Sequence, residues 1–265
     1  DFIPSSLSRV LHGDLRAKAG RRNWSRRCNL GKFSQVTPLR NPPMSNPNLT
    51  FGVVIPTKNR GDDLLRAIRS VINQIRPVDE LIVVDQSTDE NAHRFVDRLL
   101  ADHQPLPFEV RYLHNPALSG LTAAKNYGVS SSTADILLFI DDDIILESQF
   151  IWELEQAYVK YNMDGVGGAI RLSMNRSPIF HLVSLIFRLG PFWDERLALL
   201  GDTCDRRDIR FTWLMSGGLS SYKRTVFDKV KFNEELLRAS PMEDLDFHSR
   251  ARLAGPFRFG LVPRA

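Results

Sequence analysis

The sequence has very little cysteine and no long apolar run. Its two cysteines, Cys28 and Cys204, are too few for a disulfide framework and have no neighbours at zinc-ligand spacing. No stretch reaches the roughly 18 apolar residues that a membrane-spanning helix needs, and no secretory leader pattern stands near residue 1. These absences exclude a disulfide-rich extracellular domain and a zinc ribbon, and they favour a protein of the reducing cytoplasm.

Excess positive charge is confined to the first part of the chain. Residues 1–43 hold nine Lys and Arg against two Asp (+7), whereas the remaining residues hold 26 basic and 29 acidic side chains (−3). We therefore expect no nucleic-acid partner for the part after residue 43. The first 43 residues are aperiodic and rich in Arg and Ser, which predicts disorder. They are interpreted as non-native sequence before a start at Met44. The alternative is a genuine basic arm that binds anionic membranes, or a transit-like targeting segment.

From Phe51 onwards, short apolar runs alternate with segments of helical periodicity. The pattern predicts strands at Phe51–Pro56, Leu81–Asp85, Phe108–Leu113, Ile136–Ile140 and Gly165–Leu172. It predicts helices at Asp62–Gln74, Asn91–Asp102 (with Phe95, Leu99 and Leu100 inward), Leu121–Ser130 and Ser148–Tyr161. Strands that alternate with helices imply right-handed crossovers, and hence an α/β fold with a mostly parallel sheet flanked by helices.

Polar residues follow three of the predicted strands. They are Pro56–Arg60 after the first strand, Asp85–Ser87 after the second, and Asp141–Asp143 after Ile136–Ile140. Because ligands of parallel sheets lie beyond the carboxyl ends of the strands, we expect these segments to surround one cleft.

Three consecutive aspartates, Asp141, Asp142 and Asp143, are the most acidic part of this cleft. Carboxylates this close repel one another, and burying them unpaired costs free energy. A hard divalent cation such as Mg²⁺ or Mn²⁺ would remove that penalty, because it prefers carboxylate oxygens and takes one or two of them together with substrate phosphates. A solvated acidic turn is the alternative interpretation.

A second acidic group opens a helix predicted to run from Glu243 to Leu253. Acidic residues in a first turn interact favourably with the helix dipole, and this explains Glu243, Asp244 and Asp246 without any chemistry. Alternatively, one of these carboxylates is a general base, since a Gly-Gly pair at 217–218 would let the backbone approach a ligand closely.

The apolar segment Pro178–Trp193 interrupts the alternation of strands and helices. It is too short to span a membrane. It is interpreted as a core helix or a lid over the cleft, or as a membrane-surface helix that would suit a lipid-linked acceptor.

Several short motifs follow one another in a fixed order. They are Val53–Arg60, Ile82–Asp89, Gly120–Asn126, Phe139–Asp143, Val166–Gly168, Gly217–Gly218, Arg224 with Phe227, Phe232–Glu235, and Glu243–Asp246. This ordered set resembles the family 2 glycosyltransferases of the GT-A fold, whose Asp-x-Asp motif matches Asp141–Asp143. The resemblance implies that residues 44–265 form a single GT-A-like (Rossmann-like) catalytic domain.

The resemblance also implies an activity, namely metal-dependent, inverting transfer of a sugar from a nucleotide-diphosphate sugar to an acceptor hydroxyl. The product would be a polysaccharide, cell-surface glycan or glycolipid, and the acceptor a glycan or lipid-linked molecule. Peripheral contact with the inner face of the membrane is a further option. The implied roles are Pro56, Thr57, Lys58 and Asp85 at the base, Lys125 at ribose or phosphate, Asp142 at ribose, Asp141 and Asp143 at Mn²⁺ or Mg²⁺, Asp244 as catalytic base, and Glu243 as its support or an acceptor contact.

Two departures from the family pattern bear on activity. Lys125 stands where the family has Arg, so a point charge replaces a bidentate fork. The family also continues beyond a Pro-x-Ala pattern to a metal-site His, whereas this sequence ends at Pro263-Arg264-Ala265, so we expect a C-terminally truncated fragment. The alternatives are a nucleotide-sugar-binding module without turnover, a glycoside hydrolase, and a sugar-phosphate nucleotidyltransferase, although Val54–Arg60 lacks the Gly-rich loop typical of that class.

Overall fold

The computed structural model describes residues 49–89, 91–170, 209–236 and 242–262. The predictions for residues 1–43 and for Pro178–Trp193 lie outside these ranges. The strands described are β1 (Phe51–Thr57), β2 (Glu80–Asp85), β3 (Glu109–His114), β4 (Ile136–Ile140), β5 (Gly165–Gly168), β6 (Arg210–Phe211), β7 (Leu219–Lys223) and β8 (Phe259–Val262). The helices are α1 (Asp62–Ile72), α2 (Asn91–Asp102), α3 (Leu121–Ser131), α4 (Phe150–Tyr161), α7 (Arg224–Phe227) and α8 (Glu243–Ala254).

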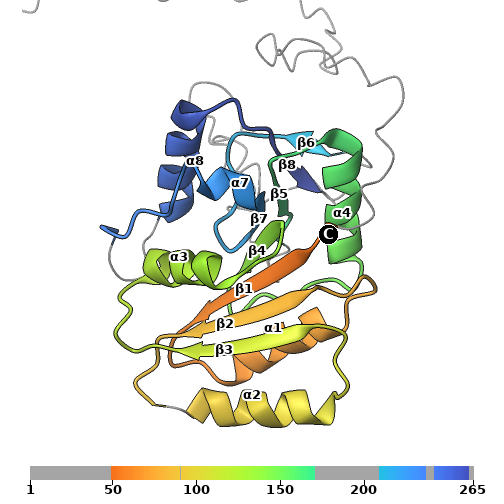
Figure 1. Cartoon of the computed structure of the whole chain (residues 1–265), viewed down its shortest axis with the longest axis vertical. Coiled ribbons are helices and arrows are strands. Elements are labelled where there is room, and N and C mark those ends of the chain that lie inside the picture. The colour runs from red at the N-terminus through yellow and green to blue at the C-terminus, as the bar shows by residue number, and fades with distance from the viewer. Residues whose placement is uncertain (1–48, 90, 171–208, 237–241, 263–265) are drawn as a thin grey trace, which may run out of the picture. The chain divides into compact units, whose positions relative to one another are not determined.

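The described strands form one sheet in the order β3-β2-β1-β4-β7-β5-β8-β6 (Figure 1). Strand β1 pairs in parallel with β2 and β4, and β2 pairs in parallel with β3. Strand β7 runs antiparallel between β4 and β5, while β5 and β8 are again parallel. The predicted α/β fold with a mostly parallel sheet flanked by helices is confirmed. No helix among the described residues has the length and apolar character of a membrane span.

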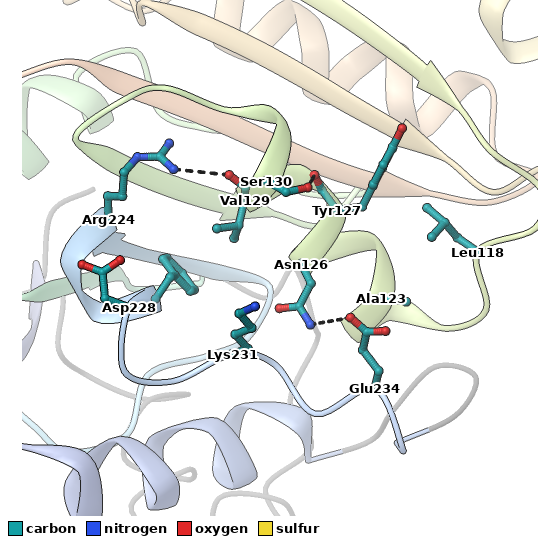
Figure 2. A pocket seen from close by; sticks show the side chains of 11 residues that line it. Leu118, Ala123, Asn126, Tyr127, Val129, Ser130, Arg224, Asp228, Lys231 and Glu234 are labelled. Atoms are coloured by element: carbon teal, nitrogen blue, oxygen red, sulfur yellow. Dashed lines mark hydrogen bonds between the residues drawn. The ribbon is translucent and has the colours of Figure 1, made fainter.

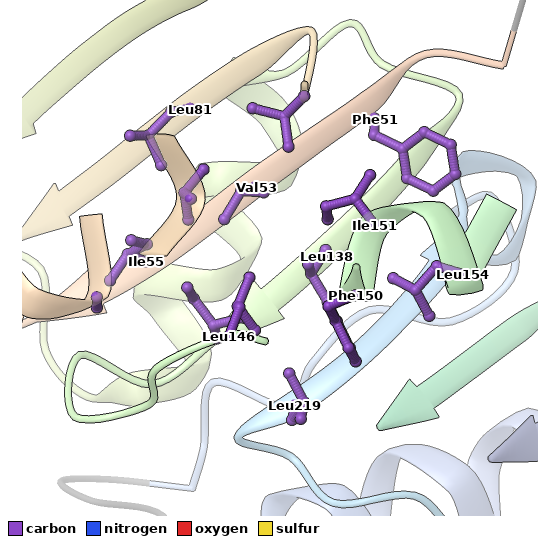
Figure 3. Packing of buried hydrophobic residues seen from close by; sticks show 14 of the residues in the cluster. Phe51, Val53, Ile55, Leu81, Leu138, Leu146, Phe150, Ile151, Leu154 and Leu219 are labelled. Carbon is purple, nitrogen blue, oxygen red and sulfur yellow. The ribbon is translucent and has the colours of Figure 1, made fainter. Parts of the chain in front are cut away.

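Apolar side chains cover both faces of the sheet. Phe51, Val53 and Ile55 of β1 point into one cluster, which α1, α2 and α4 complete (Figure 3). Val54 of β1 and Phe139 of β4 point into a second cluster on the opposite face, under α3, α7 and α8. Because both faces are buried, β1 and β4 are continuous apolar runs rather than alternating ones.

Helix α3 lies close to β1 because of Gly128. A Cβ atom at this position would sit 2.4 Å from Cγ1 of Val54, so any side chain here would push the helix off the sheet. Lys125 lies one turn earlier on α3, and its ammonium is 5.9 Å from the ring centroid of Phe139 in β4. The close packing of α3 therefore brings Lys125 to the edge of the sheet where β4 ends.

Most predicted elements form close to their expected ends, and β4 and α2 have the predicted bounds. The inward orientation of Phe95 was wrong, because 49% of this residue is exposed. Leu99 is buried as predicted, together with Ala92 and Val96, since these three follow the i, i+4, i+7 spacing of one helix face. Strand β5 ends at Gly168, earlier than predicted.

Candidate functional site

The carboxyl ends of β1, β2 and β4 lie side by side, as predicted (Figure 1). Thr57 pairs with Asp85 in the register of β1 and β2. The Oγ1 atom of Thr57 donates a hydrogen bond to Oδ2 of Asp142 at 2.7 Å, which ties the end of β1 to the aspartates after β4. The polar segments after these strands therefore share one edge of the sheet.

Arg60 extends from the loop after β1 to the same aspartates. Its Nη1 atom lies 3.1 Å from Oδ2 of Asp143 and 3.7 Å from Oδ1 of Asp142. Asn59 has a left-handed φ of 55°, which this residue type tolerates, and its N–H donates to Oγ of Ser87 after β2 at 2.8 Å. The exposed ion pairs add little stability, but they place a cation beside the carboxylates.

Asp85 is fully buried, and both of its carboxylate oxygens accept hydrogen bonds. Oδ1 accepts the backbone N–H of Ser87 at 2.8 Å, and Oδ2 accepts the hydroxyl of Tyr112 at 2.5 Å. Burial and the hydrogen bond to Asp85 raise the pKa of Tyr112, so the phenol stays protonated. Pro56 is buried and Lys58 is exposed. The predicted contacts of these residues with a nucleotide base stay predictions.

Gly217 and Gly218 lie between the two acidic centres. A Cβ atom on Gly218 would be 2.3 Å from Oδ2 of Asp141, and one on Gly217 would be 3.3 Å from Cβ of Asp244. The Asp141 N–H donates to the Gly218 carbonyl at 3.0 Å, which fixes the loop against the end of β4. A side chain at either glycine would displace a carboxylate of the site, so the glycine pair lets the end of β4 and the start of α8 come together here.

Glu243 begins α8 and is 95% buried. Its Oε1 atom accepts a hydrogen bond from Nζ of Lys125 at 2.6 Å. Asp244, the next residue, is partly exposed, and its Oδ1 accepts the N–H of Leu245 at 2.8 Å. The residue before the helix, Met242, has a left-handed φ of 71°, a strained conformation for its type.

Negative charge accumulates around the glycine pair. Burial raises the pKa of Asp141; Asp143 and Asp244 raise it further, while the positive charges of Lys125 and Arg60 oppose the rise. The pKa values of Asp142 and Glu243 are also raised, in both cases mainly by burial. The cluster therefore carries more carboxylates than its two cations neutralise.

His248 lies one turn after Asp244 on the buried side of α8. Burial lowers the pKa of His248 to about 4, so the imidazole is neutral near pH 7. Its Nδ1 atom lies 2.6 Å from the Asp244 carbonyl oxygen and Nε2 lies 3.2 Å from the Tyr222 hydroxyl. A neutral ring that donates from Nδ1 and accepts at Nε2 satisfies both contacts.

Carboxylates such as those of Asp141 and Asp143 are ligands that a hard divalent cation prefers, and substrate or water oxygens would complete its coordination. The described residues contain no group of three His, Cys, Asp or Glu side chains that could hold a metal ion alone. The raised pKa of Asp141, however, reflects burial and excess negative charge, which a cation would relieve. Asp143 already contacts Arg60, so a bound ion would share that carboxylate with the guanidinium.

A pocket of about 480 Å³ lies elsewhere, between α3 and α7 (Figure 2). Asn126 and Glu234 are hydrogen-bonded on one side of it, and Arg224 contacts the Val129 carbonyl on the other. It includes none of the predicted site residues. We therefore place the candidate site at the acidic strand ends, where charge and strained backbone coincide.

The sequence matches the family model described as Glycosyl transferase family 2 over residues 52–231, more than half of the chain. The chain belongs to glycosyltransferase family 2. The match ends before Glu243 and Asp244, so it supports the family and leaves the role of Asp244 as a prediction.

The chain spans only part of the length of the curated relatives that it matches. Glycosyltransferase GlyA of Streptococcus pneumoniae serotype 4 is 25% identical over 68% of this chain and 25% of its own length. Succinoglycan biosynthesis protein ExoM of Rhizobium meliloti is 26% identical over 62% of this chain and 54% of its own length. The chain thus spans between a quarter and about half of these relatives.

Solved structures confirm the GT-A-like fold of this family 2 chain. S. aureus TarS 1-349 in complex with UDP-GlcNAc has a TM-score of 0.59 and 18% identity, over 82% of this chain and 56% of its own. GalNAc-T7 with UDP, GalNAc and Mn²⁺ has a TM-score of 0.60 and 19% identity, over 82% of this chain and 43% of its own.

Three functional features of the site were missed by sequence reasoning. Arg60 belonged to a recognised motif but had no assigned role, and Tyr112 stood in a strand without any motif. The bond between Lys125 and Glu243 joins residues 118 positions apart. The sequence carried one signal, a lysine one turn before Gly128 in a helix predicted to pack on the sheet, because an ammonium that becomes buried needs an anionic partner.

Proposed function

We propose that the chain catalyses metal-dependent, inverting transfer of a sugar from a nucleotide-diphosphate sugar to an acceptor hydroxyl in cell-surface glycan synthesis. The observation that carries this proposal is the meeting of Asp141 and Asp244 across the Gly217–Gly218 loop. It supplies an acidic donor side and a separate carboxylate for the acceptor, which one-step transfer requires.

The names of relatives support the substrate class. ExoM is named for succinoglycan biosynthesis, and TarP of Staphylococcus aureus for poly(ribitol-phosphate) β-N-acetylglucosaminyl transfer. A Campylobacter jejuni relative is named as a glucosyltransferase acting on an undecaprenol-linked glycan. We propose a glycan or lipid-linked acceptor for this chain, reached from the cytoplasmic face of a membrane.

The donor would lie along the carboxyl ends of β1, β2 and β4. The Thr57–Asp142 hydrogen bond of 2.7 Å holds two of the proposed donor contacts next to each other. Asp142 would bind the ribose, and Lys58, which is exposed, is free to turn toward a bound base. The proposed base contacts are Pro56, Thr57 and Lys58, together with Asp85, which would exchange its hydrogen bond from the Tyr112 hydroxyl for one from the base.

Asp141 and Asp143 would hold Mn²⁺ or Mg²⁺ beside the donor diphosphate. A bound ion supplies positive charge that stabilises the departing diphosphate. Arg60, 3.1 Å from Asp143, would add a second positive charge at the same place. The GalNAc-T7 structure holds UDP together with Mn²⁺, which supports this pairing of nucleotide and ion.

Asp244 would act as the single base. It would take the proton of the acceptor hydroxyl while the hydroxyl oxygen bonds to the anomeric carbon and the bond from that carbon to the diphosphate breaks. The diphosphate leaves as an anion and needs no general acid. Attack opposite the leaving group inverts the anomeric configuration.

Nucleotide binding tests the proposal. In a thermal-shift screen of UDP, GDP, dTDP, CDP and ADP, we expect one diphosphate to raise the melting temperature with Mn²⁺ and to have a smaller effect with EDTA, because ligand binding stabilises the folded state. The matching nucleoside without phosphates is the control, and it should have little effect. If no diphosphate stabilises the chain at millimolar concentration, the proposed donor class is contradicted.

A further inference from the structure

Lys125 carries a buried ammonium that the protein itself surrounds. Among the lysines and arginines in the described ranges it alone is buried, with 1% exposed. Its Nζ atom donates to the Gly217 carbonyl at 2.9 Å and to Oε1 of Glu243 at 2.6 Å. The ring centroids of Phe232 and Phe139 lie 5.2 and 5.9 Å from Nζ. Oxygen acceptors and aromatic faces together replace water around the charge.

These contacts connect two parts of the site that are distant in sequence. Gly217 belongs to the loop between the acidic centres, and Glu243 is the first residue of α8. A Cβ atom on Gly217 would be 2.2 Å from Oε1 of Glu243, so loop and carboxylate are in direct contact. Lys125 bonds to both and fixes their separation. Asp244 follows Glu243 in the helix, so its direction depends on this bond.

Glu243 in turn depends on Lys125. Its Oε2 atom is buried and has no hydrogen-bond partner in the part of the chain that the structure describes. Removing one partner of a buried ion pair leaves an uncompensated charge, which is strongly unfavourable. Without the ammonium, Glu243 would turn toward water or take up a proton, and the first turn of α8 would move with it.

We propose that Lys125 is a positioning residue, which holds Glu243 and the Gly217 carbonyl and thereby directs Asp244 toward the acceptor hydroxyl. The proposal rests on the proposed function for the role of Asp244. The family resemblance implies a donor contact for Lys125 instead. A phosphate oxygen could reach the ammonium only by displacing the Gly217 carbonyl or Glu243, and both are good acceptors at short distance.

A Lys125→Met variant separates the two roles. We expect its affinity for UDP with Mn²⁺, measured by calorimetry, to stay within about threefold of the parent chain. Amide exchange in the first turn of α8, where the Asp246 N–H donates to the Met242 carbonyl at 3.1 Å, should accelerate by about tenfold or more. The control Lys229→Met replaces an exposed lysine and should change neither quantity. If UDP affinity falls about tenfold or more while α8 exchange is unchanged, Lys125 is a donor contact and the proposal is overturned.

The double variant Lys125→Met/Glu243→Gln distinguishes positioning from a purely structural role. Lys125→Met alone leaves Glu243 as an unpaired buried charge and should lower the melting temperature. The double variant removes both buried charges, so we expect its melting temperature to return toward the parent value. The kcat for nucleotide release from the donor selected by the binding screen should stay about 100-fold below the parent value, with the donor KM close to that of the parent, because Asp244 remains misplaced. Recovery of kcat together with stability would overturn the proposal.

The exchange measurement needs no nucleotide, and this keeps the two proposals separate. A parent chain that binds no nucleoside diphosphate would contradict the proposed function. Exchange in Lys125→Met would then still decide whether Lys125 holds the first turn of α8.

Discussion

Replacing Asp244 with asparagine is expected to slow sugar transfer by about a thousandfold, the usual scale for loss of a general base. Asparagine keeps the size of the side chain and can still accept the Leu245 N–H, but it cannot take a proton from the acceptor hydroxyl. Because Asp244 would not touch the nucleotide, the Kd for the diphosphate should stay nearly unchanged. Nucleotide release from the donor and calorimetry measure the two quantities separately.

The control for this variant is Asp246→Asn. Asp246 lies in the same first turn of α8, but its Oδ2 atom is bonded to Arg250 at 2.6 Å, outside the proposed machinery. Asp246→Asn weakens this ion pair, so we expect a slightly lower melting temperature and a kcat close to the parent value. If Asp244→Asn transfers sugar at the parent rate, Asp244 is not the base.

Removing the two proposed metal ligands should abolish most of the benefit of Mn²⁺ for nucleotide binding. We expect Asp141→Asn/Asp143→Asn to bind UDP about 100-fold more weakly in the presence of Mn²⁺, because the loss of even an outer-shell partner at a metal site costs about 10–100-fold. Without the ion, the variant should bind UDP as well as the parent or better, because two carboxylates that repel the diphosphate are gone. Calorimetric titrations with Mn²⁺ and with EDTA measure both values.

The matched control is Asp228→Asn, an exposed aspartate beside α7 and away from the acidic cluster. It should leave both titrations unchanged. If Mn²⁺ strengthens UDP binding equally in the double variant and in the parent chain, Asp141 and Asp143 are not the metal ligands.

The sequence predicted the parallel half of the sheet more closely than the rest. Apolar runs such as Ile136–Ile140 are buried on both faces, so their composition alone identifies them. Strand β7, Leu219–Lys223, contains two serines that lie buried between β4 and β5. Oγ of Ser221 donates to the Val166 carbonyl at 2.6 Å, a partner that only the tertiary fold supplies. Composition could not identify such a strand.

The placement of the acidic site was also accessible from sequence, because parallel strands bring their carboxyl ends to one edge. The prediction that polar residues after β1, β2 and β4 meet there is confirmed by the register and by the Thr57–Asp142 bond. The partner of Lys125 was not accessible. Which carboxylate meets a buried ammonium depends on how α3, the Gly217 loop and α8 pack, and no local pattern encodes that packing.

The proposed mechanism is a single-step transfer in which Asp244 deprotonates the acceptor. Proton NMR of the anomeric region during a reaction with the donor selected by the binding screen tests it most directly. The donor signal should decay only with Mn²⁺ or Mg²⁺ present, and the new glycosidic bond should have the opposite anomeric configuration. A product that retains the donor configuration, or transfer that continues undiminished in EDTA, would contradict it.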